Sequence, residues 1–152
     1  MNALAFPVAL TEPPPITRLV EKEGASRLDD ASFDGFVGAA GEAVLFFTED
    51  PLRFREVNDL AVILPEIRSA AARPFRMGVL PPPLANAKAA LYGVRRWPAL
   101  VFLRGGGWLG NIEGLREWSD YVSLGNELLL GESRPLPPRV IPVAAAGATP
   151  CA

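Results

Sequence analysis

The chain has 152 residues, of which 49% are hydrophobic and 21% charged, with a net charge of −2, no histidine and one cysteine. The lack of histidine excludes a Ser-His-Asp triad, an imidazole base and histidine metal ligands, and a lone cysteine excludes an internal disulfide, a C-x-x-C redox pair and a thiolate zinc site. The slightly acidic balance argues against nucleic-acid binding, because that affinity depends on neutralising phosphates.

Proline-rich ends mark the expected domain boundaries. Residues 1–15 and 135–152 hold four and five of the 16 prolines, respectively, and such segments favour linkers over packed structure. We therefore expect a flexible N-terminal tail over 1–15, one folded domain over 16–134 and a Pro/Ala-rich C-terminal tail over 135–152. The chain start lacks a positive n-region and a cleavage signal, and no stretch reaches the roughly 18 apolar residues of a membrane span. A cytoplasmic protein without direct membrane insertion is expected.

The first half of the domain alternates between strand and helix patterns. A weak strand is expected over 16–20, and Ser32 can cap a helix that follows. The continuous apolar run 43–47 is typical of a strand covered on both faces, and residues 48–51 form a turn rich in capping groups. Apolar spacing predicts a helix from residue 58 or 59 to residue 72. Its expected buried face is Leu60, Leu64, Ile67 and Ala71, and Pro65 should start a new turn or kink it.

The second half continues this alternation and ends in a hairpin and a helix. The expected elements are a strand over 75–80 stopped by three prolines, a helix over 84–92 closed by Gly93, a strand over 99–103, a glycine turn over 105–107, a strand over 108–112, and a helix over 115–130 that buries Trp118, Val122 and Leu129. The order β-α-β-α-β-α-β-β-α predicts an α/β fold with a mixed sheet and helices on both faces. The closing strands should be antiparallel, because three glycines are too short for a crossover.

The segment from Tyr92 to Gly106, which reads Y-G-V-R-R-W-P-A-L-V-F-L-R-G-G, resembles the thioredoxin motif Y-G-I-R-x-I-P-T-L-x-x-F-x-x-G. The resemblance implies a thioredoxin-like fold and a cis peptide bond before Pro98, facing the site. It aligns Leu45 with the buried acidic residue of thioredoxins, and it places Pro51, Leu52, Arg53 and Phe54 where thioredoxins carry Cys-Gly-Pro-Cys. Thiol–disulfide exchange needs an attacking thiolate, so the chain is expected to be redox-inactive.

A redox-inactive, histidine-free chain of this kind is similar to the HyaE/HupG/HoxO family of hydrogenase expression proteins. The similarity is carried by residues 44–51, 56–59, 62–66 and 102–118 and covers nearly all of 16–131. It implies a non-catalytic chaperone of the small subunit of a membrane-bound uptake nickel–iron hydrogenase. In that family the chaperone recognises the twin-arginine signal peptide and delays export until maturation is complete. No cofactor and no metal are implied.

Four carboxylates near the degenerate cysteine position are candidates for binding arginine: Glu49, Asp50, Glu56 and Asp59. Carboxylates form paired, charge-assisted hydrogen bonds with guanidinium groups. Phe54, Trp97 and Pro98 could supply an apolar floor beside them. A simpler interpretation stays open, in which Asp50 is a turn or helix cap, Glu49 and Glu56 are solvated charges, and Trp97 fills the core.

Two further patterns point away from enzymatic activity. Residues 105–110 match G-x-G-x-x-G, but a predicted strand rather than a helix follows, so a hairpin turn explains them better than a dinucleotide site. The pair Asp29-Asp30 could serve acid–base chemistry, yet no other groups converge on it in the sequence. The alternative to the chaperone is a redox-inactive thioredoxin-like scaffold that binds another maturation factor or itself.

Overall fold

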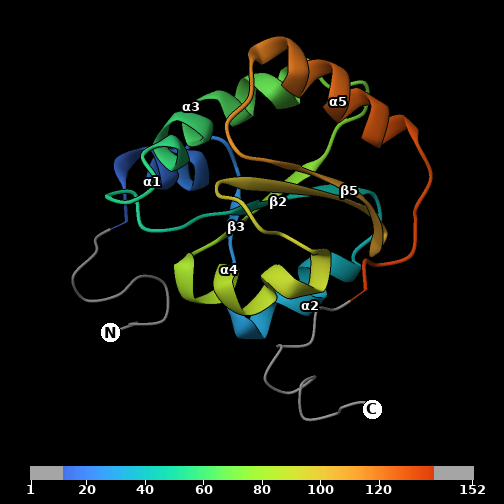
Figure 1. The fold of residues 1–152 in the computed structure, drawn as a ribbon, viewed down its shortest axis with the longest axis horizontal. Helices are drawn as coiled ribbons and strands as arrows, with labels where there is room; N and C mark the ends of the chain where they lie inside the picture. The colour runs from blue at the N-terminus through green and yellow to red at the C-terminus, as the bar shows by residue number, and fades with distance from the viewer. Residues whose placement is uncertain (1–11, 139–152) are drawn as a thin grey trace, which may run out of the picture.

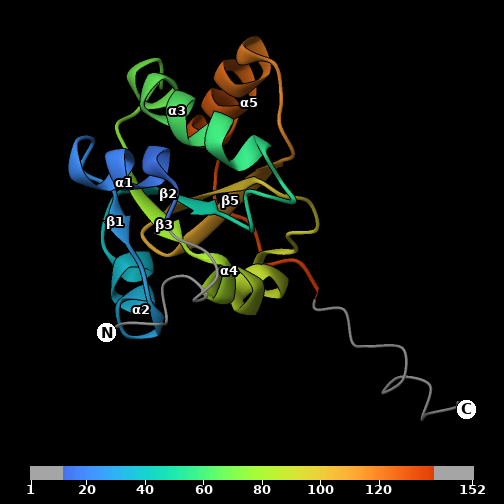
Figure 2. The same cartoon turned by 90° about the vertical axis from the view of Figure 1, so that its left-hand side faces the viewer.

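A computed structural model describes residues 12–138, in which a β-sheet lies between two layers of helices (Figures 1 and 2). The helices and strands are, in order, α1 (Pro14–Glu21), β1 (Ser26–Arg27), α2 (Asp30–Gly38), β2 (Glu42–Phe47), α3 (Glu56–Ser69), β3 (Arg76–Leu80), α4 (Pro82–Lys88), the 3-10 helix η1 (Ala89–Tyr92), β4 (Ala99–Arg104), β5 (Gly107–Glu113) and α5 (Trp118–Leu130). None of the helices in this described part is long and apolar enough to cross a membrane.

The sheet has five strands in the order β1-β3-β2-β4-β5. Strands β1, β3 and β2 are parallel, whereas β4 pairs antiparallel with both β2 and β5. The mixed sheet and the thioredoxin-like α/β arrangement predicted from the sequence are thus confirmed. Gly105 and Gly106 connect β4 to β5 with φ values of +54° and +88°, which glycine adopts without strain. This hairpin accounts for the glycine-rich motif.

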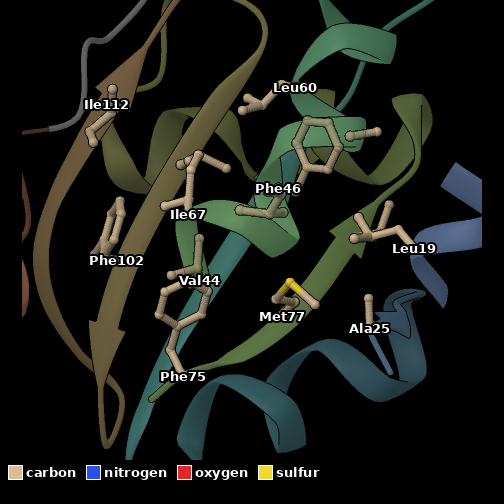
Figure 3. Packing of buried hydrophobic residues seen from close by; sticks show 14 of the residues in the cluster. Leu19, Ala25, Val44, Phe46, Leu60, Ile67, Phe75, Met77, Phe102 and Ile112 are labelled. Atoms are coloured by element: carbon tan, nitrogen blue, oxygen red, sulfur yellow. The ribbon is translucent and has the colours of Figure 1, made fainter. Parts of the chain in front are cut away.

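Alternate side chains of the central strands enter two separate cores, as expected for strands buried on both faces. Val44 and Phe46 of β2 belong to the core beneath α1, α3 and α5 (Figure 3). Ala43, Leu45 and Phe47 point the other way, into the core beneath α2, α4 and η1. The continuous apolar run of β2 is therefore required, because each face of the strand lies against a layer of helices.

Helix α2 begins at a capping box and packs closely on β3. Asp29 Oδ1 accepts the Ser32 N–H at 2.8 Å, and Ser32 Oγ accepts the Asp29 N–H at 2.9 Å. Ser32 therefore completes the first turn, and Asp29 rather than Ser32 is the cap. Gly78 of β3 allows the close approach, since a Cβ there would lie 2.8 Å from atoms of both Leu28 and Phe36.

The strand predicted over 16–20 is wrong, because these residues belong to α1. This helix buries Ile16 and Leu19, three positions apart, and it starts with Pro14 and Pro15. Proline suits a first helical turn because its φ is already helical and its missing N–H needs no partner. The helix thus takes in two residues of the expected N-terminal tail, and β1 serves as the edge strand. The structure also describes residues 12–13 and 135–138 of the two predicted tails, whereas residues 1–11 and 139–152 lie outside the described residues.

Helix α5 is shorter than predicted and faces the sheet through Tyr121, Gly125 and Leu129. Trp118 was expected in the core, but it is 48% exposed. Helical side chains lean toward the N-terminus of their helix. At the first residue of a helix this lean directs a side chain away from the helix body, which agrees with the exposure of Trp118. Val122 is partly buried.

Two other helices begin earlier than predicted. Helix α3 starts at Glu56 and continues through Pro65 to Ser69. Helix α4 starts within the proline run, at Pro82, and η1 follows it up to the left-handed Gly93. The prolines therefore end β3 and also start a helix, in agreement with the preference of proline for the first helical turn.

Candidate functional site

Three loops meet at the edge of the sheet where β2 and β5 end and β4 begins, on the left in Figure 1. Phe47 at the end of β2 pairs with Ala99 at the start of β4, which pairs in turn with Glu113 at the end of β5. The loops after β2, before β4 and after β5 therefore start side by side. The Gly114 N–H donates to the Pro98 carbonyl at 2.8 Å and joins two of these loops. The candidate residues selected from the sequence lie on or next to this edge.

The peptide bond between Trp97 and Pro98 is cis, the isomer that the thioredoxin resemblance implied. Pro98 is buried, whereas Trp97 is half-buried. The Trp97 ring packs against Phe47, with ring centroids 6.3 Å apart. Trp97 therefore contributes to the core and also presents part of its surface at the edge.

The loop that replaces the reactive cysteines is a tight turn organised by Asp50. Asp50 Oδ1 accepts the Leu52 N–H at 2.9 Å, and its carbonyl accepts the N–H groups of Arg53 and Phe54 at 3.0 and 2.9 Å. Leu52 is 81% exposed at the tip of this turn. Phe54 packs partly against the core, with the Arg53 guanidinium 5.3 Å from its ring centroid. The loop therefore presents an apolar tip and contains no nucleophilic side chain.

The four candidate carboxylates fall into two pairs. Glu49 is engaged at both oxygens, because Oε1 accepts the Asp50 N–H at 2.9 Å and Oε2 accepts the Asn86 amide at 2.7 Å. Asp50 is engaged by the turn described above. Glu56 and Asp59 lie exposed on the first turn of α3, and their side chains form no hydrogen bond or ion pair with any residue from 12 to 138. Only this second pair is free to bind a cation.

Glu113 is a further important residue at this edge, and the sequence analysis did not select it. Its Oε1 accepts the N–H groups of Arg95 and Arg96 at 2.9 and 3.1 Å. Asn111 supports it, since its Nδ2 donates to the Tyr92 carbonyl at 2.8 Å and lies 3.4 Å from Glu113 Oε2. A glutamate at the end of an apolar strand gives no sequence signal for this role, which depends on a loop 17 and 18 positions away.

Two buried tyrosines hold the flanking segments. The Tyr121 hydroxyl donates to the Gly114 carbonyl at 3.3 Å and accepts the Arg116 N–H at 3.2 Å, which fixes the loop after β5. Tyr92 packs edge-on against Phe47 before the cis-proline loop. Burial raises the pKa of both phenols, that of Tyr92 to about 12. Both therefore remain neutral at physiological pH.

Substitution of Glu113 by alanine is expected to lower the free energy of unfolding by about 0.5–1.5 kcal/mol, because two exposed amides of the cis-proline loop exchange their carboxylate acceptor for water. Glutamine should preserve much of the stability, since its carbonyl oxygen can accept the same bonds. Urea denaturation of both variants measures the difference. The control is Glu117→Ala, which removes an exposed carboxylate that has no side-chain partner among residues 12–138. Equal losses for E113A and E117A would contradict this role.

The topology, the cis-proline edge and the lack of cysteine at residues 51–54 define a thioredoxin-like protein without the dithiol. Among residues 12–138, no group of three or more His, Cys, Asp or Glu side chains is placed to hold a metal ion. The fold matches that of human ERp44 in its zinc-bound form, with a TM-score of 0.51, 19% identity, and coverage of 68% of this chain and 29% of ERp44.

The particular family follows from the sequence comparisons. The model of hydrogenase-1 expression protein HyaE matches residues 16–121. The hydrogenase expression/formation protein HoxO of Cupriavidus necator is 40% identical over 147 residues, which is 93% of this chain and 91% of HoxO. HupG of Bradyrhizobium diazoefficiens is 39% identical over 105 residues, 66% of this chain and 71% of HupG. The crystal structure of a putative HupG from Rhodopseudomonas palustris is 31% identical, with a TM-score of 0.49, and covers 68% of this chain and 94% of its own.

The chain therefore belongs to the HyaE family of hydrogenase expression proteins, and the family predicted from its sequence is confirmed. Membership supports a role in hydrogenase maturation. The names of these relatives describe expression and formation proteins, which agrees with an accessory role.

Proposed function

We propose that this protein is a non-catalytic chaperone that binds the twin-arginine signal peptide of a hydrogenase small subunit in the cytoplasm, before export. The observation that carries the proposal is the pair Glu56 and Asp59 on the first turn of α3, which is exposed and has no side-chain partner among the residues that the structure describes. Side chains three positions apart on a helix are neighbours, with Cβ atoms about 5–6 Å apart. One long arginine side chain of the leader can therefore reach each carboxylate.

The rest of the edge suits the apolar part of such a leader. The exposed Leu52 tip and the half-buried Trp97 provide apolar contacts. In the thioredoxin resemblance, the segment next to the cis-proline holds extended peptides by main-chain hydrogen bonds, a common mode of peptide recognition. The engaged carboxylates of Glu49 and Asp50 are assigned a supporting role, which is to shape the loop.

The test is fluorescence anisotropy of a labelled leader peptide with the full chain. The variant Glu56→Gln/Asp59→Asn is expected to bind the leader about tenfold more weakly or worse, since two charge-assisted pairs are lost. A leader with two lysines in place of the arginines should also bind more weakly, because an ammonium group cannot form the paired geometry.

The matched control is Glu127→Gln/Glu132→Gln, which removes two exposed carboxylates near the end of α5. This control should bind the leader as the unmodified protein does. Equal affinity for the arginine and lysine leaders would contradict the proposed mode. If the leader does not bind at all, the alternative of a scaffold for another maturation factor replaces the chaperone.

A further inference from the structure

A groove of about 1040 Å³ lies on the other side of the sheet from α3. It is bordered by η1, the loop before the cis-proline, β5 and residues 137–138. Its apolar walls include Ala89, Ala90, Val94, Trp108 and Pro137. Neither Glu56 nor Asp59 lines it, so the groove is separate from the proposed leader site.

The polar groups on the floor of this groove are satisfied within the protein. Trp108 Nε1 donates to Asn111 Oδ1 at 2.9 Å, and Asn111 donates in turn to the Tyr92 carbonyl. Glu113 accepts the amides of the loop above it. The floor therefore offers few free acceptors to a ligand.

Arginine side chains supply the hydrogen-bond donors in this groove that have no partner among residues 12–138. Arg95 and Arg96 line the groove with exposed side chains, and their guanidinium groups form no hydrogen bond or ion pair with the described residues. Arg134 lies at the Trp108 end, 5.7 Å from the indole centroid. Glu113 is the one acidic residue among the lining residues. In a chain with a net charge of −2, this groove is locally positive and rich in donors.

We propose that the groove binds an extended, acidic segment of a partner protein. Carboxylates of the segment would pair with Arg95 and Arg96, and small apolar side chains between them would contact the walls. The volume of about 1040 Å³ lies just above the roughly 300–1,000 Å³ range of small-molecule pockets, which leaves room for a peptide segment. The proposal is independent of the leader site, because a twin-arginine leader is positively charged, whereas the segment proposed for this groove is negatively charged.

The probe is a fluorescein-labelled peptide in which glutamate alternates with valine, titrated with the full chain and followed by anisotropy. We expect saturable binding that weakens with added salt. The variant Arg95→Gln/Arg96→Gln should weaken it by about tenfold or more, since both charge-assisted pairs are lost. Ala90→Trp, which fills the groove and keeps both charges, should weaken it as well.

The matched control is Arg53→Gln/Arg55→Gln, which removes two exposed arginines outside the groove and should leave the affinity unchanged. Equal binding of a peptide with glutamine in place of glutamate would overturn the proposal, as would equal weakening by the two arginine double variants. A dimer of the full chain that R95Q/R96Q dissociates, without binding of the acidic peptide, would assign the groove to a second copy and also overturn it.

Discussion

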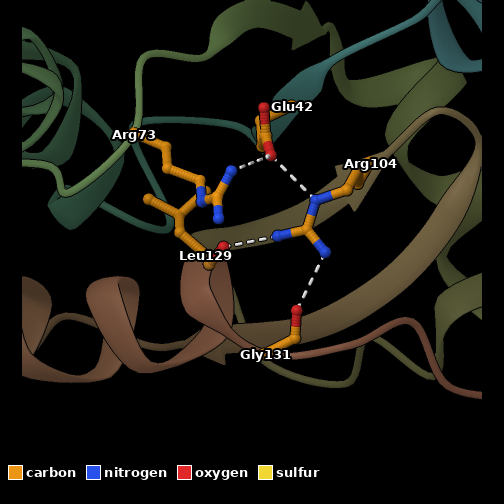
Figure 4. Close-up of polar contacts among 5 residues, drawn as sticks. All are labelled: Glu42, Arg73, Arg104, Leu129 and Gly131. Carbon is orange, nitrogen blue, oxygen red and sulfur yellow. Dashed lines mark hydrogen bonds and ion pairs between the residues drawn. The ribbon is translucent and has the colours of Figure 1, made fainter.

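Replacement of Arg104 by methionine is expected to lower the free energy of unfolding by about 3 kcal/mol, because hydrogen bonds to charged groups contribute about 1.5–3 kcal/mol each and the largely buried Glu42 carboxylate keeps only the more distant Arg73 as a partner. Arg104 Nε donates to Glu42 Oε2 at 2.8 Å, and the same guanidinium donates to the carbonyls of Leu129 and Gly131 (Figure 4). One side chain therefore joins β2, β4 and the C-terminal end of α5, where helical carbonyls lack partners.

The control for this prediction is Arg73→Met. Arg73 also approaches Glu42 Oε2, but at 3.9 Å and with a half-exposed side chain. Exposed ion pairs contribute about 0–1 kcal/mol, so urea denaturation should show a small loss for R73M and a large one for R104M. Comparable losses would mean that Glu42 is stabilised by net positive charge and not by the Arg104 hydrogen bonds.

Acid titration gives a second readout of the same contact. The hydrogen bond from Arg104 is the main cause that lowers the pKa of Glu42, although burial opposes it. A carboxyl group whose pKa is lower in the folded state stabilises the fold above its unfolded pKa of about 4.3. This contribution is lost as the pH falls through the folded pKa. The stability difference between wild type and R104M should therefore shrink in acid.

Substitution of Phe102 by alanine is expected to cost about 3–5 kcal/mol of unfolding free energy, the usual range for a large aromatic side chain in a core. Phe102 is fully buried and packs edge-on against Phe75, with centroids 6.3 Å apart. Helix α5 lies directly on it, since a Cβ at Gly125 would be 3.7 Å from the ring. The loss should be measured by urea denaturation.

Trp118→Ala is the matched control, because it removes an aromatic side chain from the first residue of α5, the helix that lies on Phe102. The half-exposed indole should contribute little, and surface substitutions are usually within about 0.5 kcal/mol. A loss for W118A as large as that for F102A would show that Trp118 is buried in solution, as the sequence analysis had predicted.

Strands β2 to β5 were predictable because their signal is local, whereas the two-residue β1 was not predicted. The buried runs of β2 and β4 are continuous and apolar, and the glycines between β4 and β5 permit one short turn. The strand predicted over residues 16–20 was wrong for the opposite reason. It is short, and its preference was decided by Pro14 and Pro15 before it and by the core beneath it, since tertiary packing overrides weak local propensity.

The candidate site was predictable only as a set of residue types. The sequence placed four carboxylates near the degenerate cysteine position, and its simpler interpretation of Asp50 as a turn cap agrees with the bond from Leu52 N–H. It did not show that Glu49 would bind Asn86. It also gave no sign of Glu113 beneath the cis-proline loop. The contacts of Glu49 with Asn86 and of Glu113 with Arg95 and Arg96 join residues far apart in the chain, so a local sequence pattern cannot predict them.

By itself, the sequence determined the order of elements from α2 onward, the loss of the Cys-x-x-C pair and the family, because these follow from composition and from contiguous motifs. Only the tertiary structure decided which charges remain free. It engages Glu49, Asp50 and Glu113 with hydrogen-bond donors. Among residues 12–138 it leaves Glu56 and Asp59 without partners on one side of the sheet, and the guanidinium groups of Arg95 and Arg96 without partners in a groove on the other. The physical reason is that the binding capacity of a charged side chain depends on the partners that folding brings within hydrogen-bond distance.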